Sequence, residues 1–162
     1  MKLYYNYKSK NNILYTLDAI VVETKDGAEY SFSSDGNQDL DREPLGGRVK
    51  GDVFLNWKFY VDKHGNEQNE ELNDELSREE LINIAKETFY KIKDDIKEVR
   101  MVFHGDKFFS EDNSLSDEEF NHSVQTDIIT DCTCELEIYN ESTGKVEEYS
   151  FNPSIDDATY VI

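Results

Sequence analysis

Two stretches of alternating apolar and polar residues, one near each end of the chain, flank a single long stretch with helical periodicity. The first spans residues 15–32 and turns at Asp26-Gly27, a pair that favours a type I′ turn because both of its central residues need a positive φ. The second joins residues 128–139 to residues 145–151 across a polar turn. Each stretch predicts an antiparallel β-hairpin.

The central stretch begins with a pattern that is typical of a helix N-terminus. Ser77 and Glu80 have the spacing of a capping box, and Leu76 and Leu81 have that of a hydrophobic staple. Apolar residues then recur every three or four positions as far as Val99, so the pattern predicts an amphipathic helix from about Ser77 to Val99.

A second, shorter helix is predicted where Ser116 and Glu119 repeat the capping-box spacing. Residues 53–61 and 101–104 have strand character, and residues 33–51 predict a long surface loop. Hairpins at both ends with helices between them predict an α+β fold. We expect a mainly antiparallel sheet of about five to seven strands, with the long helix packed on one face. The whole chain, residues 1–162, fits a single compact, acidic domain.

Negative charge is distributed unevenly along the chain. Residues 1–61 carry 9 acidic and 8 basic side chains, whereas residues 62–162 carry 27 acidic and 9 basic ones, a net charge of −18. Such a field repels phosphates and anionic membranes and attracts cationic surfaces. We therefore expect neither direct nucleic-acid binding nor membrane binding. The excess also exceeds what solubility requires, because a net charge of about 2 to 8 in magnitude suffices for a small domain.

Patterns typical of catalysis or metal binding are weak. Asp35, Asn37, Asp39 and Asp41 resemble the start of a calcium loop, but Leu40 and Gly46 replace its glycine and its bidentate glutamate. Two cysteines, at positions 132 and 134, face the same side of a predicted strand and are expected to be buried free thiols. His104, which precedes Gly105 and Asp106, is the least implausible general base. We predict no enzyme activity, no catalytic residue, no metal site and no cofactor.

Location and partner class follow from the same composition. Residues 1–7 lack the apolar core of a signal peptide, and two cysteines this close in sequence fit a reducing compartment, so we expect a cytoplasmic protein. In composition the chain resembles inhibitors of phages and mobile elements, such as anti-CRISPR and anti-restriction proteins, and immunity proteins that neutralise nuclease toxins. The resemblance covers no motif and assigns no residue roles.

These observations favour an inhibitor that imitates nucleic acid and occupies the basic groove of a nuclease or defence effector. The alternative is a non-catalytic structural or adaptor protein whose charge only provides solubility, and an enzyme or calcium-binding module is a third possibility. The predicted partner-binding residues come from two acidic stretches. They are Glu67, Glu70, Glu71, Asp74, Glu75, Glu79 and Glu80 in the first, and Asp112, Asp117, Glu118 and Glu119 in the second.

Overall fold

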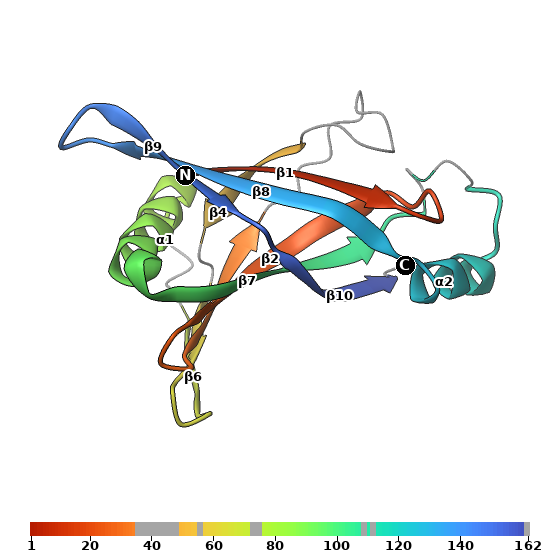
Figure 1. The fold of residues 1–162 in the computed structure, drawn as a ribbon, viewed down its shortest axis with the longest axis horizontal. Coiled ribbons are helices and arrows are strands. Elements are labelled where there is room, and N and C mark those ends of the chain that lie inside the picture. The colour runs from red at the N-terminus through yellow and green to blue at the C-terminus, as the bar shows by residue number, and fades with distance from the viewer. Residues whose placement is uncertain (35–48, 55–56, 72–75, 108–109, 111–112, 161–162) are drawn as a thin grey trace.

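The computed structural model describes residues 1–34, 49–54, 57–71, 76–107, 110 and 113–160 (Figure 1). Within these residues the helices are α1 (Arg78–Ile92) and α2 (Asp117–Gln125), and a short 3-10 helix, η1 (Lys93–Asp95), follows α1. The strands are β1 (Lys2–Ser9), β2 (Tyr15–Thr24), β3 (Glu29–Ser34), β4 (Val49–Phe54), β5 (Trp57–Val61), β6 (Glu67–Glu71), β7 (Ile96–Gly105), β8 (Ile129–Asn140), β9 (Lys145–Phe151) and β10 (Ser154–Tyr160).

All ten of these strands belong to one mixed sheet. Eight of them follow the order β10-β7-β2-β3-β4-β1-β8-β9, while β5 pairs with β3 and β6 pairs with β5. Among the described strands, β10 and β7 run parallel and the other pairs run antiparallel. The predicted α+β class is confirmed. The predicted count of five to seven strands was too low, because the expected strand over residues 53–61 is divided into β4 and β5 and because β6 and β10 were not predicted.

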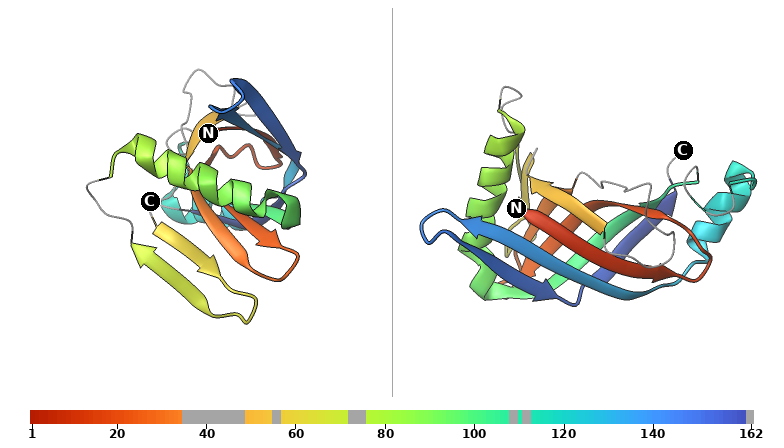
Figure 2. Two further views of the ribbon diagram at one scale, coloured as in Figure 1. Left: turned by 90° about the vertical axis from the view of Figure 1, so that its left-hand side faces the viewer. Right: turned by 90° about the horizontal axis from the view of Figure 1, so that it is seen from above.

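The sheet curves strongly, so that strands distant in its order face each other across the core (Figure 2). Three strands separate β1 from β7 in the sheet order, yet the ring centroids of Tyr5 and Tyr7 on β1 are 5.9 and 5.3 Å from that of Phe103 on β7. Tyr15 of β2 completes the group, 5.9 Å from Tyr7. All four rings are buried, and offset or edge-on contacts of this kind stabilise a core beyond the area they bury.

Helix α1 crosses one end of the curved sheet, and α2 lies at the opposite end (Figures 1 and 2). The buried side of α1 consists of Ala85, Phe89 and Ile92. The ring of Phe89 packs edge-on against Tyr149 and Phe151 of β9, with centroid separations of 5.1 and 6.4 Å. The helix therefore holds the C-terminal hairpin to the rest of the core.

The predicted end of the long helix was wrong. Helix α1 ends at Ile92, and Ile96 and Val99 belong to β7. Their spacing from Phe89 fits a helix, but Val99, Met101 and Phe103 are buried at every second position, as in a strand. Pairing with β2 along most of its length, where Val99 lies opposite Val22, outweighs the local helical pattern.

Both predicted hairpins are confirmed, β2 with β3 and β8 with β9. The predicted type I′ turn is not. Gly27 has a φ of +89°, but Asp26 is not among the residues with a positive φ. Instead, Asp26 accepts hydrogen bonds from the Thr24 hydroxyl, at 2.5 Å, and from the Ala28 amide, at 3.3 Å. Its side chain closes a longer turn, as aspartate often does.

Three other segments depart from the predicted pattern. The single strand expected over residues 53–61 is divided between β4 and β5, and β4 pairs with both β1 and β3. Of the loop expected over residues 33–51, the first residues belong to β3 and the last belong to β4. Residues 35–48 lie outside the described residues. Strand β10 was not predicted, because its parallel pairing with β7 depends on a distant partner.

The capping boxes at Ser77 and Ser116 are both formed. The Ser77 hydroxyl accepts a hydrogen bond from the Glu80 amide at 3.2 Å, and the Glu80 carboxylate accepts one from the Ser77 amide at 2.7 Å. Replacing Ser77 by alanine removes the first of these bonds and should cost about 0.5 to 2 kcal/mol of stability. Chemical denaturation measures the change. Ser77→Thr, which keeps an acceptor, serves as the control, and equal losses in both variants would contradict a capping role.

Candidate protein-binding surfaces

Part of the first predicted acidic stretch forms β6, which pairs with β5 in a two-stranded arm that stands away from the body (Figure 2). Its turn is shaped by Asp62, whose carboxylate accepts hydrogen bonds from the amides of His64 and Asn66, both at 2.9 Å. Gly65 provides a φ of +79° there, which other residues rarely adopt. The arm is therefore built around a defined turn.

Three of the predicted contact residues, Glu67, Glu70 and Glu71, lie on β6. The side chain of Glu67 is exposed, and the strand register places Glu70 opposite Lys58. Among the described strands, β6 pairs only with β5, so its other edge is open. Charged residues on an edge strand oppose its pairing with other sheets. Asp74 and Glu75, also predicted contacts, lie outside the described residues.

The predicted contacts on α1 have different surroundings. Glu79 and Glu80 are both exposed in the first turn of the helix. Glu80 is engaged in the capping box, whereas Glu79 has no such role in the cap. Both residues favour the helix start, because carboxylates stabilise the positive end of the helix dipole. Their position therefore has a structural explanation that is independent of any partner.

The second acidic set lies on α2, at the opposite end of the molecule from α1 (Figure 1). Asp117 forms an ion pair with Lys107 at 2.9 Å, and Glu119 closes the capping box of α2. Glu118 is exposed, and Asp112 lies outside the described residues. The structure therefore separates the predicted contact residues into two surfaces, at opposite ends of the molecule (Figure 1).

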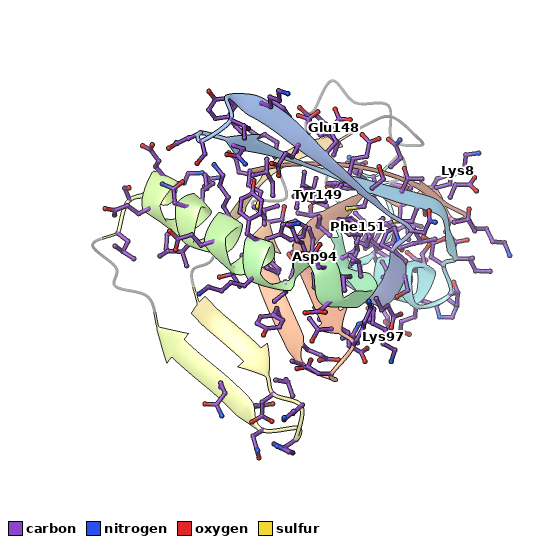
Figure 3. The ribbon with its side chains drawn as sticks, turned by 60° about the vertical axis from the view of Figure 1, so that its left-hand side comes forward. Lys8, Asp94, Lys97, Glu148, Tyr149 and Phe151 are labelled. Atoms are coloured by element: carbon purple, nitrogen blue, oxygen red, sulfur yellow. The ribbon has the colours of Figure 1, made fainter. Side chains whose placement is uncertain are left out.

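The predicted contacts do not include a third acidic surface that the structure shows. On the outer face of the C-terminal hairpin, Glu137 of β8 lies directly opposite Glu148 of β9, and the next pair of opposite residues, or rung, on that face is Glu135 and Ser150. Figure 3 labels Glu148 on β9. The next rung toward the turn pairs Tyr139 with Val146. The predicted hairpin, with residues 140–144 as its turn, would instead pair Tyr139 with Lys145, whereas the structure pairs Asn140 with Lys145. This shift of one residue changes which side chains lie opposite each other.

The inner side of the same hairpin is fastened to α1 through Glu147. Its carboxylate accepts hydrogen bonds from the side chains of Tyr90 at 3.0 Å, Asn140 at 2.8 Å and Tyr149 at 2.8 Å. Hydrogen bonds from these three donors lower the pKa of Glu147, and the bond from Asn140 has the largest effect. Burial and the hydrogen bond to the Glu147 carboxylate raise the pKa of Tyr149 to about 12. These bonds fix which face of the hairpin points outward.

Features suited to catalysis or metal binding are few in the described part of the chain. Cys132 and Cys134 are free, and burial raises the pKa of their thiols to about 11 and about 12, so both stay protonated at neutral pH. His104 has its Nδ1 atom 2.6 Å from the Asp18 carboxylate. No group of three or more histidine, cysteine, aspartate or glutamate side chains among the described residues could hold a metal ion. The calcium-like segment at residues 35–46 lies outside the described residues.

Comparison with models of known families, with curated proteins and with solved structures finds no match to this chain. Among the described helices, neither is long and apolar enough to cross a bilayer. The surface geometry therefore has to support any functional assignment.

Proposed function

We propose that this protein is a non-catalytic, acidic inhibitor that binds a basic nucleic-acid-handling protein, such as a nuclease or defence effector, and covers its nucleic-acid groove. The observation that supports this most is the projecting β5–β6 arm, whose outer strand carries three glutamates and pairs with no described strand other than β5. A narrow acidic arm has a suitable shape for a groove that otherwise holds phosphates. Its turn and strand β6 belong to residues 62–162, the segment with a net charge of −18.

Electrostatic attraction determines how such a complex forms. Opposite net charges accelerate the encounter of two proteins, and salt screens this attraction over roughly 10 Å at about 0.1 M ionic strength. We therefore expect the association rate to fall steeply with added salt, while the dissociation rate changes less. The alternative, a structural or adaptor protein whose charge only maintains solubility, gives no reason for a cationic partner or for competition with nucleic acid.

The test begins with cross-linking of the protein in host lysate and identification of the captured partner by mass spectrometry. The purified partner is then mixed with labelled nucleic acid, and displacement is measured as this protein is added. We expect displacement at concentrations near the dissociation constant of the complex. A partner that keeps its nucleic acid while bound to this protein would contradict the proposal.

Two matched variants locate the contact. Glu67→Lys/Gln68→Lys changes two exposed positions on the arm, and Glu118→Lys/Gln125→Lys changes two exposed positions on α2 by the same total charge. We expect the arm variant to weaken binding by about tenfold, since it removes an attractive charge and adds two repulsive ones at the contact. The α2 variant should change binding much less. Equal weakening by both variants would indicate a general field effect without a defined contact at the arm.

A further inference from the structure

The outer face of the β8–β9 hairpin exposes two large side chains beside each other. Tyr139 is 54% exposed and Val146 is 55% exposed, and they lie directly opposite one another in the register. Ile128, at 51%, is the other large apolar side chain that is strongly exposed in the described residues. Single exposed apolar residues are ordinary, but adjacent ones on a rigid sheet face are typical of a contact surface.

The neighbouring rung is electrostatically unfavourable in the isolated chain. Glu137 and Glu148 are directly opposite each other, and like charges in this position destabilise a sheet. On its other side, Glu137 lies opposite Lys2 of β1, but the ammonium group of Lys2 is bound to Asp52. A cation placed over this rung would relieve the repulsion. This observation is independent of the exposure of Tyr139 and Val146.

We propose that this outer face binds an extended, basic segment of a partner protein. The aliphatic stems of its arginine or lysine residues cover Tyr139 and Val146, and their charged ends reach Glu137 and Glu148. Arginine suits both contacts, because its guanidinium group stacks on aromatic rings and pairs with carboxylates. Rungs on one face of the hairpin repeat every ~6.6 to 6.8 Å, which is also the repeat of alternate side chains in an extended segment.

Other occupants fit this face less well. A second copy of the chain would bring the same carboxylates, with the same sign of charge, against Glu137 and Glu148. Nucleic acid and anionic membranes are repelled for the same reason. The inference goes beyond the proposed function, since a basic segment of any protein satisfies it, whether or not that protein handles nucleic acid.

The probe is a fluorescent synthetic peptide that alternates arginine with valine over about nine residues, a length that covers about four rungs of the hairpin. Its binding to the full chain is measured by fluorescence anisotropy at about 0.15 M salt, where weak long-range attraction is screened. Tyr139→Thr/Val146→Thr should weaken binding by about tenfold, and Glu137→Gln/Glu148→Gln should do the same. Ile128→Thr, an equally exposed apolar-to-polar change elsewhere, should have no effect.

Each other outcome overturns the inference. Binding that falls in the charge variant but not in the Tyr139/Val146 variant would be attraction to charge without a docking face. Binding that falls only in Glu67→Lys/Gln68→Lys would place the peptide on the β5–β6 arm and leave the proposed function intact. Thermal melts check folding, and Glu148→Gln should melt no lower than the wild type because it removes the opposed charge.

Discussion

Replacing Phe89 by alanine should lower the free energy of unfolding by about 3 to 5 kcal/mol, the usual loss for a buried phenylalanine. The side chain is 2% exposed and connects α1 to β9 through the rings of Tyr149 and Phe151. Its removal leaves a cavity in a region where the helix closes one end of the curved sheet. We therefore expect a large decrease in the midpoint of chemical denaturation, with a smaller decrease for Phe89→Leu, which fills part of the space.

Tyr139→Ala is the matched control, because it truncates an aromatic residue that is 54% exposed. Its effect on stability should stay within about 0.5 kcal/mol, as for most surface substitutions. An unchanged melting temperature in Phe89→Ala, together with loss of partner binding, would instead mean that the apolar side of α1 is a recognition face. A helix of that kind would dock into a groove on its partner.

The second large effect is expected at Asp127, a carboxylate that joins the β1–β2 turn to the segment between α2 and β8. It accepts hydrogen bonds from the Ser9 hydroxyl, from the Tyr15 hydroxyl at 2.7 Å, and from the amides of Asn11 at 2.8 Å and Ile128 at 2.9 Å. Asp127→Ala should cost about 2 to 3 kcal/mol, since bonds to a charged acceptor are lost and the buried Tyr15 hydroxyl loses its acceptor.

A double-mutant cycle with Tyr15→Phe isolates one of these bonds. Burial and the Asp127 carboxylate raise the pKa of Tyr15, so its hydroxyl remains a donor at neutral pH. Tyr15→Phe keeps the buried ring and removes only that donor. We expect the double variant to lose less stability than the sum of the two single losses, by about 0.5 to 3 kcal/mol. Additive losses would show that the two groups stabilise the fold separately.

The candidate surfaces show which site residues can be found from short patterns in the sequence and which cannot. Glu80 and Glu119 were predicted as contacts from charge alone, although the capping-box spacing that predicts the two helices already gives their carboxylates a structural role. The Glu137–Glu148 and Tyr139–Val146 pairs did not follow from the predicted C-terminal hairpin, because its five-residue turn would place Tyr139 opposite Lys145. The Asp127 cluster had no local signal, because its donors lie more than 100 positions away in sequence, apart from the adjacent Ile128 amide.

By itself, the sequence determined the features that depend on residues a few positions apart. Helix starts at Ser77 and Ser116 require only a hydroxyl and a carboxylate three residues later, and the two hairpins require only alternation around a turn. The acidic character of residues 62–162 is likewise a matter of composition.

The tertiary structure alone decided what depends on distant partners. Ile96 and Val99 joined a strand because β7 pairs with β2 along most of its length, and β10 formed because β7 has a second edge to pair with. Curvature of the sheet brought β1 against β7 and placed the two predicted acidic sets at opposite ends. Such pairings are selected by the burial and hydrogen bonding of the whole sheet, which no short window of sequence contains.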